Sequence, residues 1–202
     1  MRIGIDFDNT IVSYDQLFHT VAVEQAVIPL DTPINKIAIR DYLRRHDKET
    51  TWTEMQGYVY GACMDDASAY PGVLNFMRVA KAAGHELAIV SHKTRHPFLG
   101  PQYDLHAAAR GWANRHLWVD GERLVPAGNI FFELTKEEKL ARVLDFKCDA
   151  FIDDLPEILF AESFPDHTRR ILFDPEDHHA NIDTNTCIRC RSWAGIQAAL
   201  VL

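Results

Sequence analysis

The sequence has few of the features that mark membrane, secreted and nucleic-acid-binding proteins. Its 202 residues contain no run of 18 apolar residues, and the first apolar strand begins at residue 2, too early for a signal peptide. The four cysteines (Cys63, Cys148, Cys187 and Cys190) are too few for a disulfide framework in a chain of this length. The net charge of -8 argues against a nucleic-acid or membrane-surface partner. We therefore expect a cytoplasmic globular protein.

Residues 3–10 are the most informative segment. A short apolar strand ends in two carboxylates, Asp6 and Asp8, and Asn9 and Thr10 follow at once. Because side chains alternate along a strand, we expect Asp6 and Asp8 to leave on the same side at its carboxyl end. Two carboxylates held this close repel each other unless a cation or a shared proton lies between them. Hard oxygen ligands of this kind suit Mg²⁺, so the segment predicts a magnesium site.

Strand-like and helix-like apolar patterns alternate along most of the chain. This alternation indicates an α/β fold with a doubly wound, mostly parallel sheet. Beyond the first strand, the patterns predict strands at 86–90, 129–132, 149–152 and 171–173 and helices at 73–83, 104–116, 135–145 and 193–202. Gly84 is placed to end one helix, and Thr135 with Glu138 is placed to begin another with a capping box.

Polar side chains stand at the carboxyl ends of three predicted strands. Asp6 and Asp8 follow the first strand, Ser91 follows the strand 86–90, and Asp153-Asp154 follows the strand 149–152. In doubly wound sheets, ligands bind outside the carboxyl ends of the strands. We therefore expect these side chains to meet in one crevice.

Residues 14–69 interrupt the alternation of strands and helices. They predict three amphipathic helices, at 14–28, 34–45 and 53–69, with Thr51 and Glu54 in capping-box positions for the third. We interpret residues 14–69 as an inserted helical cap, and residues 1–13 and 70–202 as the catalytic core.

Taken in order, these motifs resemble those of the haloacid dehalogenase superfamily of phosphohydrolases. The segment Asp6-Phe7-Asp8-Asn9-Thr10 matches the first motif, Ser91 the second, a lysine of the predicted helix 135–145 the third, and Asp153-Asp154 the fourth. The match spans residues 1 to about 175, and the helical insert is similar to the first cap type of the family. The sequence around Ser91 and Asp153 also resembles, less specifically, that of the 5'(3')-nucleotidase-like branch of the superfamily.

The resemblance implies a Mg²⁺-dependent phosphatase in which each motif has a role. Asp6 would be the nucleophile that forms an aspartyl-phosphate, and Asp8 the general acid and then the base. Ser91 and one lysine would hold the phosphoryl oxygens. Both Lys136 and Lys139 could be this lysine. Lys139 is preferred, because the segment Thr-Lys-Glu-Glu-Lys resembles family members with a short helix. The candidate substrate-binding residues are Thr10, Ser91, His92, Lys93 and Lys136, and the candidate metal ligands are Asp6, Asp8, Asp153 and Asp154.

Other readings stay open at this point. His178, His179, Cys187 and Cys190 include a CxxC and could bind zinc, although such a combination is more often accidental. A carbon–halogen hydrolase or a non-catalytic phosphate-binding protein could use the same fold. The resemblance implies that carbon–halogen hydrolases lack an acid two residues after the nucleophile and need no metal, so Asp8 and the acidic pair favour phosphate. We expect the substrate to be a small soluble phosphomonoester, such as a sugar phosphate or a nucleotide.

Overall fold

The chain folds into two compact units. The computed structural model describes residues 1–182 and 185–201. Unit 1 consists of residues 1–12, 69–93 and 116–202, and unit 2 of residues 13–68 and 94–115. Unit 2 thus holds the predicted insert together with a second segment that follows Lys93. That residues 14–69 act as a cap stays a prediction.

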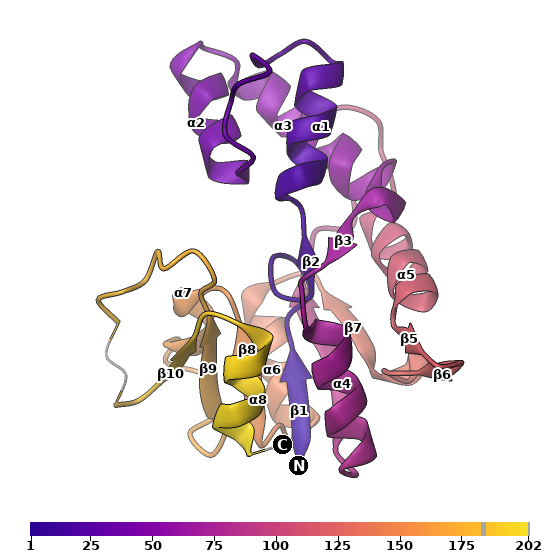
Figure 1. Ribbon diagram of the computed structural model, residues 1–202, viewed down its shortest axis with the longest axis vertical. Coiled ribbons are helices and arrows are strands. Elements are labelled where there is room, and N and C mark those ends of the chain that lie inside the picture. The colour runs from indigo at the N-terminus through magenta and orange to yellow at the C-terminus, as the bar shows by residue number, and fades with distance from the viewer. Residues whose placement is uncertain (183–184, 202) are drawn as a thin grey trace. The chain divides into compact units, whose positions relative to one another are not determined.

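Unit 1 is built on a parallel sheet, in which the described residues form six strands (Figure 1). The strand order across the sheet is β10-β9-β8-β1-β4-β7, and each pair of neighbours is parallel. The strands are β1 (Arg2–Ile5), β4 (Glu86–His92), β7 (Ile130–Glu133), β8 (Ala150–Asp153), β9 (Arg169–Phe173) and β10 (Ile188–Cys190). This sheet confirms the predicted α/β fold class.

Helices cover both faces of the sheet. They are α4 (Val73–Ala82), α6 (Lys136–Asp145), α7 (Pro156–Leu159) and α8 (Trp193–Leu200). On one face, Phe173 of β9 contacts Trp193 of α8, which in turn contacts Phe76 of α4. On the other face, the neighbouring Leu172 belongs to a buried cluster with Leu140 of α6 and residues of α7. Burial on both faces explains why the strands are almost continuously apolar.

The direction of winding reverses at β1. From β1 the chain moves outward through β4 and β7, then returns to the other side of β1 and moves outward through β8, β9 and β10. Ile5 of β1 pairs in register with Ile89 of β4 and with Ile152 of β8. Ligands of doubly wound sheets bind at such a reversal, outside the carboxyl ends of the strands. The residues that follow β1 therefore begin at the reversal point.

Unit 2 is helical. Its elements are α1 (Asp15–Glu24), α2 (Lys36–Arg45), α3 (Glu49–Gly61), the 3₁₀ turn η1 (Met64–Asp66) and all but the last residue of α5 (Leu105–His116). Two glycines of α3 let the segment 94–115 approach its backbone. A Cβ added to Gly57 would lie 2.6 Å from Pro97, and one added to Gly61 would lie 2.5 Å from Tyr103. This close approach explains why residues 94–115 pack with unit 2.

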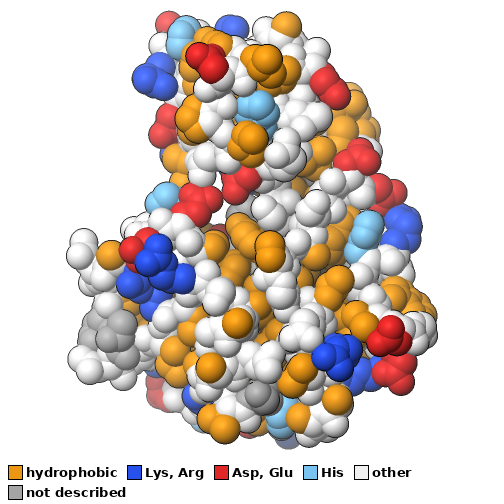
Figure 2. All heavy atoms as spheres, in the orientation of Figure 1, with side chains coloured by type: hydrophobic (Ala, Val, Ile, Leu, Met, Phe, Trp, Pro, Cys, Tyr) orange, Lys and Arg blue, Asp and Glu red, His pale blue; other side chains and the backbone are white. Residues whose placement is uncertain are grey.

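Four very short strands and one further 3₁₀ turn complete the fold. Strands β2 (Val12–Ser13) and β3 (Ser68–Ala69) pair with each other, as do β5 (Trp118–Val119) and β6 (Glu122–Arg123), and η2 spans Ala127–Asn129. No helix in the described part of the chain is long and apolar enough to cross a bilayer. In the space-filling view of Figure 2, basic side chains form small separate groups mixed with acidic ones.

Most predicted helix ends agree with the structure, but three do not. Thr135 and Glu138 form the predicted capping box, and Gly84, at φ +77°, follows the last residues of α4 as expected. The capping box at Thr51 and Glu54 was wrong, because α3 already begins at Glu49 and both residues lie within it. The first helix ends at Glu24, four residues before the predicted end. The third ends at Gly61, eight residues before its predicted end at residue 69. Neither α7 nor β10 was predicted, since both are too short to show a period.

Candidate active site

Three neighbouring strands bring polar side chains together at the reversal point. Asp6 follows β1 and donates its backbone N–H to the carbonyl of Ile152 in β8 at 2.9 Å. Ser91 lies near the end of β4, and Asp153 ends β8. All three side chains are buried, although aspartate and serine are mostly exposed in proteins. A buried polar cluster at this position is a candidate functional site.

Asp6 is the centre of the cluster. Its Oδ1 accepts a hydrogen bond from Ser91 Oγ at 2.9 Å and one from Lys139 Nζ at 2.6 Å. Its Oδ2 lies 3.4 Å from Thr10 Oγ1, which also lies 3.3 Å from Asp154 Oδ1. The structure therefore brings together five residues singled out in the sequence, from four separate segments of the chain.

Helix α6 places one of its two candidate lysines in the cluster and the other at the surface. The capping box at Thr135 starts the helix, and Lys139 follows one turn later with 2% of its side chain exposed. Lys139 Nζ lies 2.6 Å from both Asp6 Oδ1 and Asp153 Oδ2. Lys136 instead pairs with Glu157 at 2.6 Å on the exposed side of the helix.

The charge of Lys139 is set by its two carboxylate partners. Burial by itself would lower the pKa of the ammonium group, but the charges of Asp153 and Asp6 raise it above its ordinary value. Lys139 is therefore a cation at neutral pH, and it offers a fixed positive charge to an anion that enters the cluster.

Asp6, Asp153 and Asp154 fit a divalent metal ion. One oxygen from each carboxylate lies within 4.8 Å of the others, and no other group of this kind occurs in residues 1–182 and 185–201. Burial raises the pKa of Asp153 to about 7. The negative charge of Asp6 also raises this pKa, and the positive charge of Lys139 lowers it in part. A cation would relieve this crowding of carboxylates, and an all-oxygen set suits Mg²⁺.

Asp8 lies outside this group of three carboxylates. It precedes a tight turn in which Asn9 has φ +58°, a conformation that asparagine tolerates better than most residues. Both oxygens of Asp8 bind Lys93 Nζ, at 2.9 and 2.6 Å. This pairing was missed in the sequence, where Lys93 was a candidate only for substrate binding. His92 is half-buried at the end of β4, in register with Glu133 of β7.

Comparison with solved structures decides the fold family. A hydrolase from Deinococcus radiodurans R1, solved with bound phosphate and sodium, matches with a TM-score of 0.59 and 16% identity over 99% of this chain and 94% of that chain. A predicted phosphoglycolate phosphatase from Haemophilus somnus matches with a TM-score of 0.55 and 14% identity over 98% and 96%. A phosphoserine phosphohydrolase-like protein from Francisella tularensis matches with a TM-score of 0.55 and 14% identity over 100% and 99%.

The chain has the fold of the haloacid dehalogenase superfamily. No family model matches the sequence, and no curated protein does. The fold family is therefore visible in the structure and in the short motifs, whereas the comparisons of the sequence alone do not show it.

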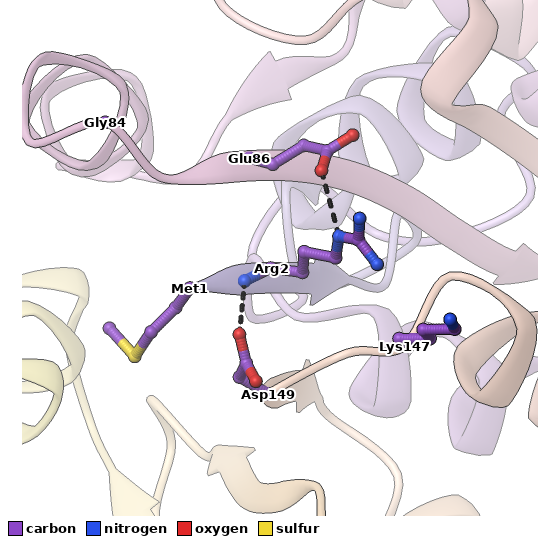
Figure 3. Close-up of a pocket in the computed structure, with 6 residues that line it drawn as sticks. All are labelled: Met1, Arg2, Gly84, Glu86, Lys147 and Asp149. Carbon is purple, nitrogen blue, oxygen red and sulfur yellow. Dashed lines mark hydrogen bonds and ion pairs between the residues drawn. The ribbon is translucent and has the colours of Figure 1, made fainter.

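Other candidate sites in this haloacid dehalogenase fold have less support than the cluster around Asp6. A surface hollow lies at the opposite, amino end of the sheet (Figure 3), lined by Met1, Arg2, Gly84, Glu86, Lys147 and Asp149. Two of its charged side chains pair with each other, since Arg2 Nε donates to Glu86, and the backbone N–H of Arg2 donates to Asp149.

The C-terminal CxxC does not form a metal site with the nearby histidines in the described residues. Cys187 is part of the buried cluster against α6 and α7, and burial raises the pKa of its thiol to about 11. Burial also raises the pKa of the Cys190 thiol. His178 pairs instead with Glu176 at 2.7 Å. The thiols of Cys187 and Cys190 thus behave as core side chains.

Proposed function

We propose that the protein is a Mg²⁺-dependent phosphatase that hydrolyses a small phosphomonoester through an aspartyl-phosphate on Asp6. The main support is the surroundings of Asp6: a buried carboxylate at the reversal point, held by Ser91 and Lys139 and grouped with Asp153 and Asp154. One cluster thus holds side chains that could serve as a nucleophile, as two groups for the phosphoryl oxygens and as a cation-binding set.

In the first step, a carboxylate oxygen of Asp6 attacks phosphorus, and the bond from phosphorus to the leaving oxygen breaks. Asp8 enters this step protonated and gives its proton to that oxygen, so the alcohol leaves neutral. In the second step, Asp8 takes a proton from water, whose oxygen attacks the phosphoryl group and frees Asp6. Asp6, Asp153 and Asp154 would hold Mg²⁺, which supplies positive charge against the phosphate. Ser91 and Lys139 bind and orient the phosphoryl oxygens.

Charge and the comparisons support the proposed substrate class. A protein with a net charge of -8 repels extended polyanions, whereas the buried cations Lys139 and Lys93 can attract one phosphate group locally. The structural neighbours include a predicted phosphoglycolate phosphatase and a hydrolase with bound phosphate. We infer a small phosphorylated metabolite in the cytoplasm, with residues 14–69 as a helical cap that limits its size. Asp8 and the three grouped carboxylates favour phosphate esters over carbon–halogen bonds.

A substrate screen tests this proposal. Purified protein would be assayed for phosphate release from nucleotides, sugar phosphates and phospho-acids, and for halide release from 2-haloacids, with and without a chelator. We expect phosphate release that stops on chelation and returns with Mg²⁺. Phosphatase activity that survives complete metal removal, or halide release without phosphate release, would overturn the proposal.

A further inference from the structure

Two buried lysines bind three of the four candidate carboxylates, and each lysine binds a different set. Lys139 binds Asp6 and Asp153, at 2.6 Å each. Lys93 binds both oxygens of Asp8, and only 5% of the Lys93 side chain and 21% of the Asp8 side chain are exposed. Asp8 is accordingly absent from the carboxylates that lie within 4.8 Å of one another in the described residues.

The backbone holds Lys93 in a defined place. Lys93 follows β4 and donates its N–H to the carbonyl of Glu133 in β7 at 2.8 Å, which extends the sheet by one residue. Its ammonium group therefore reaches Asp8 from a strand that also carries Ser91. A charge-assisted contact to both carboxylate oxygens fixes the direction of the Asp8 side chain as well as its position.

We propose that Lys93 is a positioning residue that holds the Asp8 carboxylate apart from Asp6, Asp153 and Asp154. The inference rests on the proposed function, in which Asp8 must exchange a proton with the leaving oxygen. A carboxylate beside a divalent cation is drawn to it, because the attraction between opposite charges is strong in a buried site. Lys93 opposes this attraction and keeps Asp8 available for the leaving oxygen.

The first test compares two leaving groups. For Lys93→Met we expect kcat/KM to fall by a factor on the order of 100 with benzyl phosphate, whose leaving oxygen needs a proton, and by less than about tenfold with 4-nitrophenyl phosphate. Asp8→Asn should show the same pattern, and the double variant should be no slower than Asp8→Asn. Lys81→Met removes an exposed lysine that pairs with Glu122 and is the matched control. Lys93→Arg should restore the ratio of the two rates.

The second test needs no turnover. Mn²⁺ affinity would be measured by calorimetry for the wild type, Asp8→Asn, Lys93→Met and the double variant. We expect Asp8→Asn to change the affinity less than twofold while Lys93 is present, and to weaken it about fivefold or more once Lys93 is replaced. Lys93→Gln, which also removes the charge, serves in place of Lys93→Met if the latter does not fold, and Lys93→Arg should keep the Asp8→Asn effect below twofold.

The two tests separate the possible failures. An equal loss with both phosphates, or an Asp8→Asn effect on Mn²⁺ that is the same in both backgrounds, overturns the role of Lys93 and leaves the phosphatase proposal intact. A wild type that releases no phosphate from any substrate overturns the proposed function. The Mn²⁺ measurements then still decide whether Lys93 holds Asp8 apart.

Discussion

The two ends of strands β1, β4 and β8 have charged residues in opposite environments. At the amino ends, Arg2 and Glu86 form an ion pair of 3.1 Å with 48% of each side chain exposed (Figure 3). At the carboxyl ends, Lys139 and Asp6 form an ion pair of 2.6 Å with 2% and 6% exposed. Side chains of opposite charge thus meet in water at one end and inside the protein at the other.

Burial explains why only one end is suited to chemistry. An exposed pair contributes about 0–1 kcal/mol, because water screens it and both side chains lose freedom. A buried pair has been removed from water, so the loss of one partner leaves a charge without compensation. The carboxyl ends therefore hold charges that act on a bound anion at close range. The predictions below test this contrast, from the largest expected effect to the smallest.

The largest effect should come from matched aspartate substitutions at the two ends. Asp6→Asn removes the nucleophile, so phosphatase turnover should fall by a factor on the order of 10⁶, or to the detection limit. Asp149→Asn, at the amino end, should leave turnover within about twofold of the wild type. Steady-state assays with 4-nitrophenyl phosphate measure both. Comparable losses in the two variants would remove the contrast between the ends.

Lys139→Met should be the most damaging substitution for stability. It leaves Asp6 and Asp153 as buried carboxylates without their cation, at a cost of about 3–5 kcal/mol in the free energy of unfolding. Urea unfolding of chelator-treated protein at pH 8 measures the difference. A cost under about 1 kcal/mol would show that the buried pair behaves like a surface pair.

Mg²⁺ should stabilise the protein, and more strongly at higher pH. The pKa of Asp153 is raised from 3.8 to about 7 by burial, so the metal-free fold keeps a proton there that the unfolded chain has lost. The stability due to this group is complete below pH 3.8 and is lost as the pH rises through about 7. Mg²⁺ competes with that proton. At about 100 times its Kd, the ion should add about 2.7 kcal/mol.

Thermal unfolding with and without Mg²⁺ at pH 5.5 and pH 8 checks this expectation. The increase in Tm should be larger at pH 8. Asp153→Asn should reduce it at both pH values, whereas Asp149→Asn should not. An increase that is equal at the two pH values, or that persists in Asp153→Asn, would exclude Asp153 as the titrating ligand.

The smallest effect should come from the amino end. Arg2→Ala breaks the exposed pair with Glu86, and we expect a change in the free energy of unfolding of less than about 1 kcal/mol. The difference should shrink further at high salt. Urea unfolding at two salt concentrations measures it. A loss as large as that of Lys139→Met would contradict the role given to burial.

Local sequence signals predicted the core elements of unit 1 well. The capping box at Thr135 and the glycine after α4 are signals within a few residues, and both were read correctly. The chain between Ser91 and α5 was harder to interpret. The approach of Pro97 and Tyr103 to the glycines of α3 joins residues about 40 positions apart, and no local pattern reveals it. The strand β10 has only three residues, too few for a period to appear.

The sequence by itself determined which chemical groups are available and at which strand ends they stand, because alternation and capping are properties of neighbouring residues. Only the tertiary structure decided which cation faces which carboxylate. Lys139 and Asp6 are 133 positions apart, and Lys93 and Asp8 are 85 positions apart. Such pairs form when the sheet brings distant strand ends together. Their strength then depends on burial, which the packing of the whole unit creates.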